Sequence, residues 1–182
     1  MNPEQLAKSG TEHAEQCALF CWANMAVKYG FPAANNMANY RDPVPAYGFE
    51  PVPSLRWLHA IPNAGARGNK VAASQLKAEG VKAGVADVFL PSSVWIGEAK
   101  PSKSFLCGLY IELKREDGVP SDISKEQIEF AAHVTEQNYA WAVAFGWKQA
   151  AALITAYIKC ETPTLTPKQA QVLQRVAAAS KA

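Results

Sequence analysis

The chain has 182 residues, of which 49% are hydrophobic and 19% are charged, and this composition excludes a disordered, collagenous or coiled-coil protein. Eighteen basic and sixteen acidic residues give a formal net charge of +2, which is too small to attract nucleic acid to the whole surface. No stretch reaches the roughly 18 apolar residues of a membrane span, and the N-terminal residues lack the pattern of a secretory signal, so we expect one cytoplasmic domain without membrane contact.

The first predicted element is a helix over residues 12–29, where apolar side chains recur at the three- and four-residue spacing of a helix with one buried face. Five prolines make residues 31–53 an irregular insertion, and a loop of this length is more often functional or dimer-forming than idle. A short strand is predicted for residues 55–61 and a helix for residues 70–79, which Gly80 ends.

Residues 85–90 form the next predicted strand, and residues 92–104 a loop with a turn at Gly97. In the predicted strand 109–114, aliphatic side chains alternate with Tyr, Glu and Lys, so one face of this strand belongs to the core. The later predicted elements are a helix at 125–137, a strand at 139–145, a helix at 147–159, and a last helix that starts with Thr166, Pro167 and Gln169 in capping-box register.

This order of elements predicts a single α/β domain over residues 1–182, with a small mixed sheet flanked by helices. Its core is expected at about residues 12–158. Residues 160–182 form a C-terminal helical extension that packs on the domain or against a second subunit.

Acidic and basic side chains on two predicted strands could form one site. Side chains two residues apart on a strand point to the same side, so Glu112 and Lys114 project together, although such a pair alone is usually a solvated ion pair. Asp87 is a lone acid in an otherwise apolar strand, and a buried acid needs a partner. If the two strands are neighbours, Asp87 and Glu112 converge, and two such carboxylates raise each other's pKa or bind a hard cation.

Magnesium suits such a pair, because it takes one or two protein carboxylates, keeps several waters and leaves positions for phosphate oxygens. The ion would act as a Lewis acid on a phosphodiester and lower the pKa of a bound water. Lys114 would orient or deprotonate that water, or neutralise the charge that builds up on phosphorus, and the residues leave these roles open.

The order of these motifs resembles that of the PD-(D/E)XK nucleases, and the longer pattern resembles their VRR-NUC branch. The resemblance covers residues 12–158 and rests on the segments 12–16, 59–67, 75–87, 109–114, 124–127, 146–150 and 157–158. It implies a restriction-endonuclease-like core and a DNA endonuclease that depends on Mg²⁺ or Mn²⁺. Asp87, Glu112 and the Leu113 carbonyl would bind the metal, Lys114 would be the catalytic lysine, and Glu12 would reach the metal through water.

Ala86 and Gly84, which precede Asp87, affect the conformation of the backbone there. The family usually has proline directly before the aspartate, where this chain has Ala86, and we expect activity to survive because the proline supplies no chemistry. Gly84 either lets a backbone approach the substrate closely or is simply a turn glycine. The stand-alone phage and bacterial members of the family are associated with homodimers that cut branched DNA such as four-way (Holliday) junctions, which implies a role in DNA repair and recombination.

Two candidate residues also fit a purely structural pattern. Glu12 stands three residues after Ser9, and Gln127 stands three residues after Ser124, so each could close a capping box at the start of a helix. Glu15 is the alternative to Glu12 on the same helix. Gln127 could also donate a hydrogen bond in the active site, and its two roles are compatible.

Basic residues are concentrated in residues 56–103, where seven Lys or Arg and three acids give a local charge of +4. A solvated surface is the simpler explanation on composition alone. Within this stretch, Arg67 could bind a phosphate bidentately and Asn63 a base or backbone group, the alternative being a turn with a solvated arginine. Lys70 and Lys82 would add attraction for phosphate.

His13, Cys17 and Cys21 share one helical face, which suggests a soft-metal site such as zinc, but a fourth ligand at suitable spacing is absent. The four cysteines are too few and too scattered for a disulfide framework. His59 and His133 are expected to be structural.

The sequence contains no helix-turn-helix or finger motif, so DNA shape should matter more than base sequence. Four tryptophans could stack on bases, but core packing is the expected role of Trp57, Trp95, Trp141 and Trp147.

Three other functions compete with a dimeric junction nuclease. A monomeric nuclease would nick or trim duplex or flap DNA. A DNA-binding module could keep the fold without the chemistry, although Asp87, Glu112 and Lys114 are all present. A protein-interaction domain would use the proline-rich residues 31–53.

Overall fold

The computed structural model describes residues 2–36, 50–62, 70–97 and 104–181. The α-helices are α1 (Pro3–Ala7), α2 (Glu12–Tyr29), α3 (Phe31–Asn35), α4 (Lys70–Ala78), α5 (Lys125–Glu136), α6 (Trp147–Ile158) and α7 (Pro167–Ala179). The strands are β1 (His59–Ala60), β2 (Val88–Leu90), β3 (Val94–Ile96), β4 (Ser104–Leu106), β5 (Leu109–Lys114) and β6 (Ala140–Phe145). The 3₁₀ turns η3 (Pro53–Trp57) and η4 (Pro120–Asp122) precede β1 and α5.

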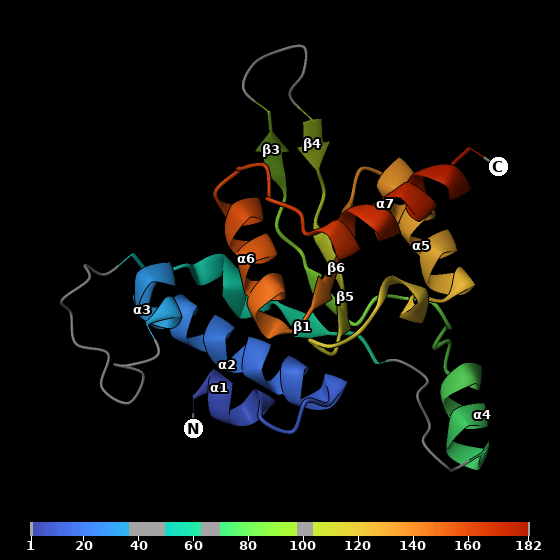
Figure 1. Cartoon of the computed structure of the whole chain (residues 1–182), viewed down its shortest axis with the longest axis horizontal. Coiled ribbons are helices and arrows are strands. Elements are labelled where there is room, and N and C mark those ends of the chain that lie inside the picture. Colours follow the sequence, from blue (N-terminus) through green and yellow to red (C-terminus); the bar gives the residue numbers. More distant parts are fainter. Residues whose placement is uncertain (1, 37–49, 63–69, 98–103, 182) are drawn as a thin grey trace.

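The central sheet of the described residues has the strand order β1-β2-β5-β6 (Figure 1). The pairs β1–β2 and β2–β5 run antiparallel, whereas β5 and β6 run parallel. Strands β3 and β4 form a separate antiparallel hairpin, which projects from the body of the molecule at the top of Figure 1. The prediction of an α/β fold with a small mixed sheet flanked by helices is confirmed.

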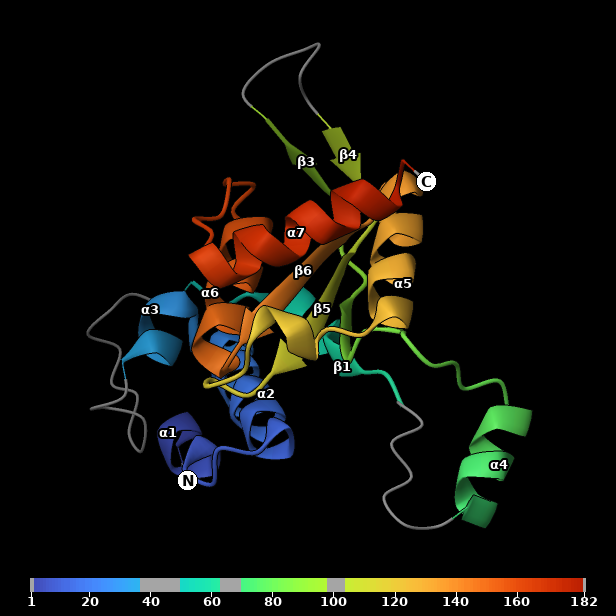
Figure 2. The ribbon, with the colours of Figure 1, turned by 45° about the vertical axis from the view of Figure 1, so that its right-hand side comes forward.

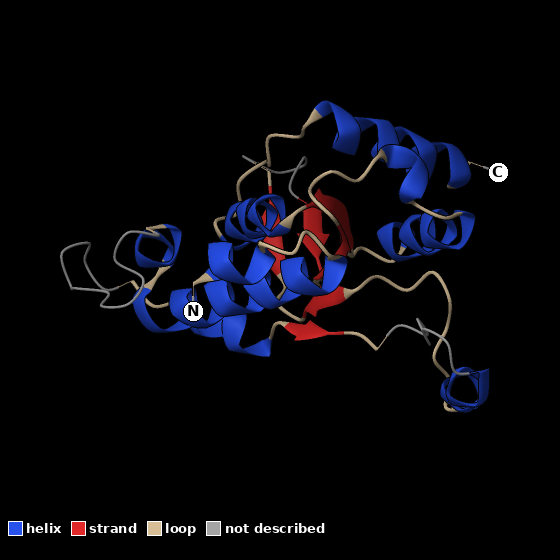
Figure 3. Ribbon diagram, turned by 60° about the horizontal axis from the view of Figure 1, so that its bottom comes forward, coloured by secondary structure: helices blue, strands red, loops and turns tan. Residues whose placement is uncertain are grey.

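Helices cover both faces of the sheet, and the residues of β5 show how. Its odd-numbered residues Leu109, Ile111 and Leu113 are buried in a core that includes residues of α2 and α6. The even-numbered Tyr110 packs against a second core on the opposite face, formed with α5 and α7. Figures 2 and 3 show the sheet between these helical layers. The alternation in this strand therefore places the site residues of β5 on the α5 side of the sheet.

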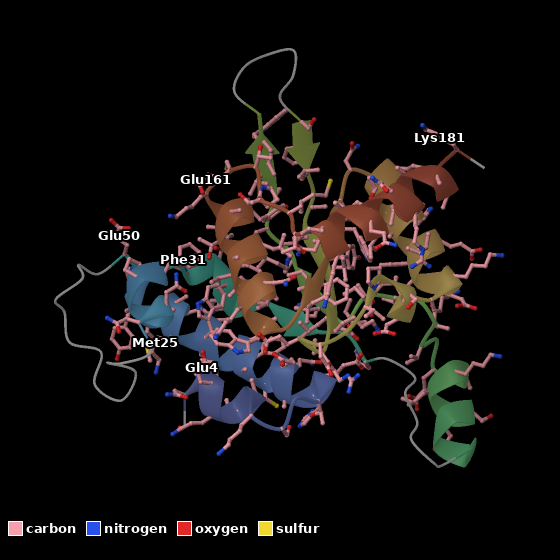
Figure 4. The ribbon with its side chains drawn as sticks, in the orientation of Figure 1. Glu4, Met25, Phe31, Glu50, Glu161 and Lys181 are labelled. Carbon is pink, nitrogen blue, oxygen red and sulfur yellow. The ribbon has the colours of Figure 1, made fainter. Side chains whose placement is uncertain are left out.

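Helix α2 has the predicted bounds. Thr11 is its N-cap residue and accepts a hydrogen bond from the N–H of Ala14 (3.2 Å). Gly30 ends the helix with a φ of +89°, and a Cβ atom there would lie 2.5 Å from the carbonyl oxygen of Glu50. Glycine is therefore required, both for the left-handed conformation and for this close approach. Phe31 and Glu50 lie at the same end of the molecule in Figure 4.

The prediction of a strand over residues 55–61 is wrong for most of its length. Leu55 and Leu58 are buried, while Arg56 and Trp57 between them are exposed. Burial at a spacing of three is the period of a 3₁₀ turn and not of a strand. The turn η3 accordingly occupies the first part of the segment, and β1 alone joins the sheet.

The prediction of a loop over residues 92–104 is wrong where the hairpin of β3 and β4 forms. Val94 and Ile96 are half-buried on either side of the exposed Trp95, an alternation too short to identify a strand from sequence. The insertion at 31–53 begins with α3, and its residues 37–49 lie outside the described residues. Among the described segments, α1 is a helix that the sequence pattern did not predict.

Helix α4 has the predicted position in the chain and lies apart from both helical layers (Figures 1 and 2). No helix in the described part of the chain is both long enough and apolar enough to cross a bilayer.

Candidate active site

The pairing of β2 with β5 brings the two predicted metal-binding carboxylates together. Val88 pairs with Ile111, so one further step of the antiparallel register sets Asp87 opposite Glu112. The Asp87 side chain accepts a hydrogen bond from the N–H of Leu113 (2.8 Å), which holds its carboxylate against β5. The expectation that the two strands are neighbours is confirmed, and Asp87 and Glu112 lie on the same side of the sheet.

Glu112 is fully buried, and its two carboxylate oxygens have different surroundings. Oε1 accepts hydrogen bonds from the Lys114 ammonium (2.9 Å) and from the Gln127 side-chain amide. Among the described residues, Oε2 has no hydrogen-bond partner. Burial raises the pKa of Glu112 to about 8, the nearby Asp87 charge adds to this effect, and Lys114 opposes it only in part.

Lys114 links Glu112 to the start of α2. Its Nζ atom lies 3.7 Å from the Oε1 atom of Glu12, whose side chain is 47% exposed. Burial acts to lower the pKa of Lys114, but the attraction of Glu112, Glu12 and Asp87 is larger in sum and raises it. The charges of Glu12, Glu112 and Asp87 therefore all act on one ammonium group.

The structure corrects one alternative for Glu12 and explains Glu15. Thr11, rather than Ser9, is the N-cap of α2, so Glu12 does not close a capping box with Ser9. Glu15 is buried, and its Oε2 atom accepts a hydrogen bond from the N–H of Trp147 (2.9 Å) at the start of α6. Burial raises the pKa of Glu15. Glu15 thus caps helix α6, whereas Glu12 lies beside Lys114.

Gln127 makes the contacts that both of its predicted roles require. Its Oε1 atom accepts from the Ser124 N–H (2.8 Å) and its own N–H donates to the Ser124 hydroxyl (3.2 Å), which completes the capping box of α5. Its Nε2 atom is left free of the cap and donates to Glu112. The start of α5 therefore fixes one oxygen of the buried carboxylate.

The donor set of this site fits a hard divalent cation. In an extended strand the N–H and C=O groups of one residue face the same neighbouring strand, so the Leu113 carbonyl points to the Asp87 side, like its N–H. Asp87, Glu112 and this carbonyl offer only oxygen donors, which Mg²⁺ and Mn²⁺ prefer. The buried Oε2 of Glu112 would gain the partner that the described residues do not give it. Within the described ranges, no three His, Cys, Asp or Glu side chains form a cage, so waters and phosphate oxygens would complete the coordination.

The alternative soft-metal site gains no support. The His13 Nε2 and Cys17 Sγ atoms lie 3.6 Å apart, and Cys21 completes the predicted helical face. No metal-binding group of three is found among the described residues, and no disulfide joins the four cysteines, all of which the structure describes. His59 is exposed on β1, and His133 is exposed on α5.

The predicted DNA-binding residues are described only in part. Asn63 and Arg67 lie outside the described residues, as does the Lys70 side chain, and Lys82 is exposed. A Cβ atom at Gly84 (φ +85°) would lie 2.5 Å from the carbonyl oxygen of Glu126 at the start of α5. The close approach that Gly84 permits is therefore to a helix of the same chain.

The four tryptophans divide between core and surface. Trp141 and Trp147 are buried, as predicted, but Trp57 is 61% exposed and Trp95 is 52% exposed, so core packing is the wrong interpretation for these two. Trp57 belongs to η3, where the incorrectly predicted strand would have buried it. The rings of Phe89 and Tyr110 stack with their centroids 4.4 Å apart, a contact that was not predicted. The signal for it was the spacing, since each ring is two residues from a carboxylate of the site and so shares its face of the sheet.

The comparisons with known proteins bear on the fold. No family model matches the chain, and no curated protein matches it. Among solved structures, the chain is similar to a "VRR_NUC domain protein" with a TM-score of 0.51 and 21% sequence identity, over 85% of this chain and 97% of that one. The chain therefore has the fold of a VRR_NUC domain protein, as the sequence resemblance implied.

Proposed function

We propose that the chain is a metal-dependent endonuclease that hydrolyses DNA phosphodiester bonds at the site formed by Asp87, Glu112 and Lys114. The observation that carries this proposal is the meeting of two carboxylates from separate strands beside an ammonium group, with Lys114 Nζ 2.9 Å from Glu112 Oε1. The shared fold with a VRR_NUC domain protein supports it.

Each residue has a role that follows from its contacts. Asp87, Glu112 and the Leu113 carbonyl would hold Mg²⁺ or Mn²⁺, which when bound supplies a Lewis acid for the phosphate and a bound water of lowered pKa. Lys114 brings a positive charge to the scissile phosphate. Gln127 orients Glu112, and Glu12 extends the acidic rim next to the lysine.

The test is cleavage of supercoiled plasmid and of a four-way junction with Mg²⁺, with Mn²⁺ and with EDTA. Glu112→Gln and Asp87→Asn keep the size of each side chain and remove its charge, so each should reduce cleavage by at least about a hundred-fold, as expected for loss of a group that acts at the reaction centre. Glu161→Gln, at an exposed position on the loop after α6, serves as the charge-matched control. Full activity of Glu112→Gln would overturn the proposal.

For the substrate, we propose branched DNA cut by a homodimer, as the sequence resemblance implies. Gel filtration together with cleavage of a junction and of a linear duplex separates this from a monomer that nicks or trims duplex or flap DNA. Binding without any cleavage would identify a silent DNA-binding module. Asn63, Arg67, Lys70 and Lys82 are the proposed contacts to DNA, with Asn63 binding a base or a backbone group and the three basic residues binding phosphates. Alanine at the three basic positions should weaken binding in a salt-dependent way.

A further inference from the structure

The edge of the sheet lies directly beside Asp87. The N–H of Ile61 donates a hydrogen bond to the Asp87 carbonyl (2.8 Å), and β1 pairs with β2 through His59 and Phe89. Just before β1, Leu55 and Leu58 anchor η3 in the core. This segment therefore has a fixed position next to the proposed active site.

The anchored segment presents an exposed indole with a cationic neighbour. Trp57 is 61% exposed, and the guanidinium carbon of Arg56 lies 5.1 Å from its ring centroid. The Nδ1 atom of His59 lies 2.9 Å from the Trp57 carbonyl oxygen. An exposed tryptophan with a guanidinium group against its ring is suited to a planar ligand that carries negative charge nearby.

Aromatic rings continue from this point across the sheet. The ring of His59 contacts Phe89 edge-on (centroids 5.7 Å apart), and Phe89 stacks on Tyr110 (4.4 Å). Tyr110 and Glu112 are two residues apart on β5, so they share a face and lie about 7 Å apart along the strand. The rings of Phe89 and Tyr110 thus lie on the same face of the sheet as the carboxylates of Asp87 and Glu112, two residues further along each strand. This separation is within the reach of a single nucleotide.

We infer that Arg56, Trp57 and His59 form a stacking site for an unpaired nucleobase next to the scissile phosphate. The inference rests on the proposed function and narrows its substrate to nucleic acid with an unpaired nucleotide at the cut. Inside a duplex both faces of each base are covered by neighbouring bases, so away from duplex ends the Trp57 ring can stack only on a base in a single strand, flap or opened branch. Arg56 adds charge attraction for the phosphates of the same strand.

The hairpin provides a matched control. Trp95 is 52% exposed and contacts Phe105 across β3 and β4 (centroids 5.1 Å apart). Trp95 lies after Leu90, the last residue of β2, whereas Asp87 lies directly before the first residue of this strand. Replacing Trp95 therefore removes an indole that is about as exposed as that of Trp57 but lies away from the carboxylates.

The experiment measures binding in EDTA, so that cleavage does not interfere. The probes are a duplex with a single-stranded tail, which carries 2-aminopurine as its first unpaired base, and the same duplex with a blunt end. The parent should quench the 2-aminopurine fluorescence. Trp57→Ala should abolish the quenching and weaken binding of the tailed DNA about ten-fold or more, because loss of one stacked base has this size of effect. Binding of the blunt duplex should not change.

Further variants decide between stacking and other roles of Trp57. Trp57→Phe should restore most of the affinity for tailed DNA, and Trp95→Ala should match the parent. Equal binding of both probes by Trp57→Ala and parent would overturn the inference. So would an equal loss for both probes, or a change in oligomeric state on gel filtration, which would make Trp57 a contact between subunits.

The test of the stacking site and the test of the nuclease proposal can fail independently. Cleavage that depends on Glu112, combined with normal tail binding by Trp57→Ala, would remove only the stacking site. Quenching by the parent without any metal-dependent cleavage would keep the stacking site and remove the nuclease proposal.

Discussion

At the scale of single residues, Glu112 combines a position for chemistry with a cost in stability. Its pKa in the folded protein is about 8, against an ordinary value of 4.5, so the folded state binds its proton more tightly than the unfolded state. The stabilisation from this proton is complete below about pH 4.5 and is lost as the pH rises to about 8. In the absence of metal, the charged form of Glu112 is therefore unfavourable in the folded chain.

Glu112→Gln should consequently stabilise the metal-free protein in alkaline buffer. We expect its melting temperature in EDTA at pH 8.5 to exceed that of the parent by about 5 °C or more, since 1 kcal/mol corresponds to roughly 2–4 °C for a chain of this size. Melting followed by circular dichroism at pH 4.5 is the control and should show a much smaller difference. A variant less stable than the parent at pH 8.5 would contradict the pKa assignment.

Addition of Mg²⁺ completes this comparison. An ion that binds only the folded state raises the melting temperature of the parent in a concentration-dependent manner. Glu112→Gln lacks one of the proposed ligands and should respond much less.

Gln127 shows what the spacing of residues can and cannot predict. The Ser124 to Gln127 spacing predicted the capping box, but the pattern could not show that the amide nitrogen also reaches a strand residue fifteen positions earlier in the chain. Gln127→Glu should separate these roles, because glutamate also closes a capping box but cannot donate to Glu112. We expect kcat to fall by about ten-fold or more with little change in KM, as for loss of a positioned hydrogen bond.

Gln127→Ala is the companion variant, since it removes both the cap and the amide. If Gln127 served only as a cap, Gln127→Glu would cleave at the rate of the parent and Gln127→Ala would lose mainly stability. Urea denaturation of both variants, measured beside their kinetics, distinguishes the two cases.

At the scale of elements, the helix starts were predictable, but the group that caps each start was predictable only where it is local in the chain. The caps of α2, α5 and α7 come from side chains within three residues of the helix start, and the bounds of these helices agree with the sequence pattern. Helix α6 instead begins at Gly146, without a side-chain cap of its own. Its first N–H is satisfied by Glu15, which lies 132 residues away in the chain.

Glu15→Ala should therefore destabilise the junction of α2 and α6. It leaves the Trp147 N–H buried without an acceptor and creates a small cavity, so we expect a loss of about 2–3 kcal/mol in the free energy of unfolding. Glu15→Gln keeps an acceptor of the same length and should lose less. Urea denaturation measures both values, and equal losses for the two variants would show that the hydrogen bond is not the cause.

Short elements were the least predictable, because tertiary packing rather than a local pattern decides which of their residues are buried. The three residues of β3 and of β4 are too few to establish a period, and η3 was mistaken for a strand because apolar residues recur in both. The stacking site at Trp57 lies in one of these segments. Its prediction required the burial of Leu55 and Leu58, which tertiary packing decides.

At the scale of the whole molecule, the site exists only because distant segments meet. The sequence order indicated an α/β domain, but the neighbours of each strand depend on long-range pairing. Asp87 lies directly before β2, Glu112 and Lys114 come from β5, Glu12 from α2 and Gln127 from α5. Motif spacing could name these residues, and only the fold could bring them together at one site.

The C-terminal extension also belongs to this assembly, because α7 fastens the segment that leads into α5. The Arg175 guanidinium donates to the Pro120 and Ile123 carbonyls (2.6 and 2.9 Å), and the Gln169 amide donates to the Val143 carbonyl of β6 (2.8 Å). Of the two positions considered for this extension, packing on its own domain is the one observed. The contacts of Arg175 end one residue before Ser124, the N-cap of α5.

Arg175→Ala should for this reason weaken both stability and catalysis. We expect a loss of about 2–3 kcal/mol in the free energy of unfolding, since two carbonyls lose a charged donor, and a lower kcat because the start of α5 no longer holds Gln127 firmly. Arg175→Lys should recover only part of both, because an ammonium lacks the fork that reaches two carbonyls. Lys181→Ala, at the exposed end of the chain in Figure 4, is the control. Parent-like kcat in a folded Arg175→Ala protein would show that α5 keeps its position without α7.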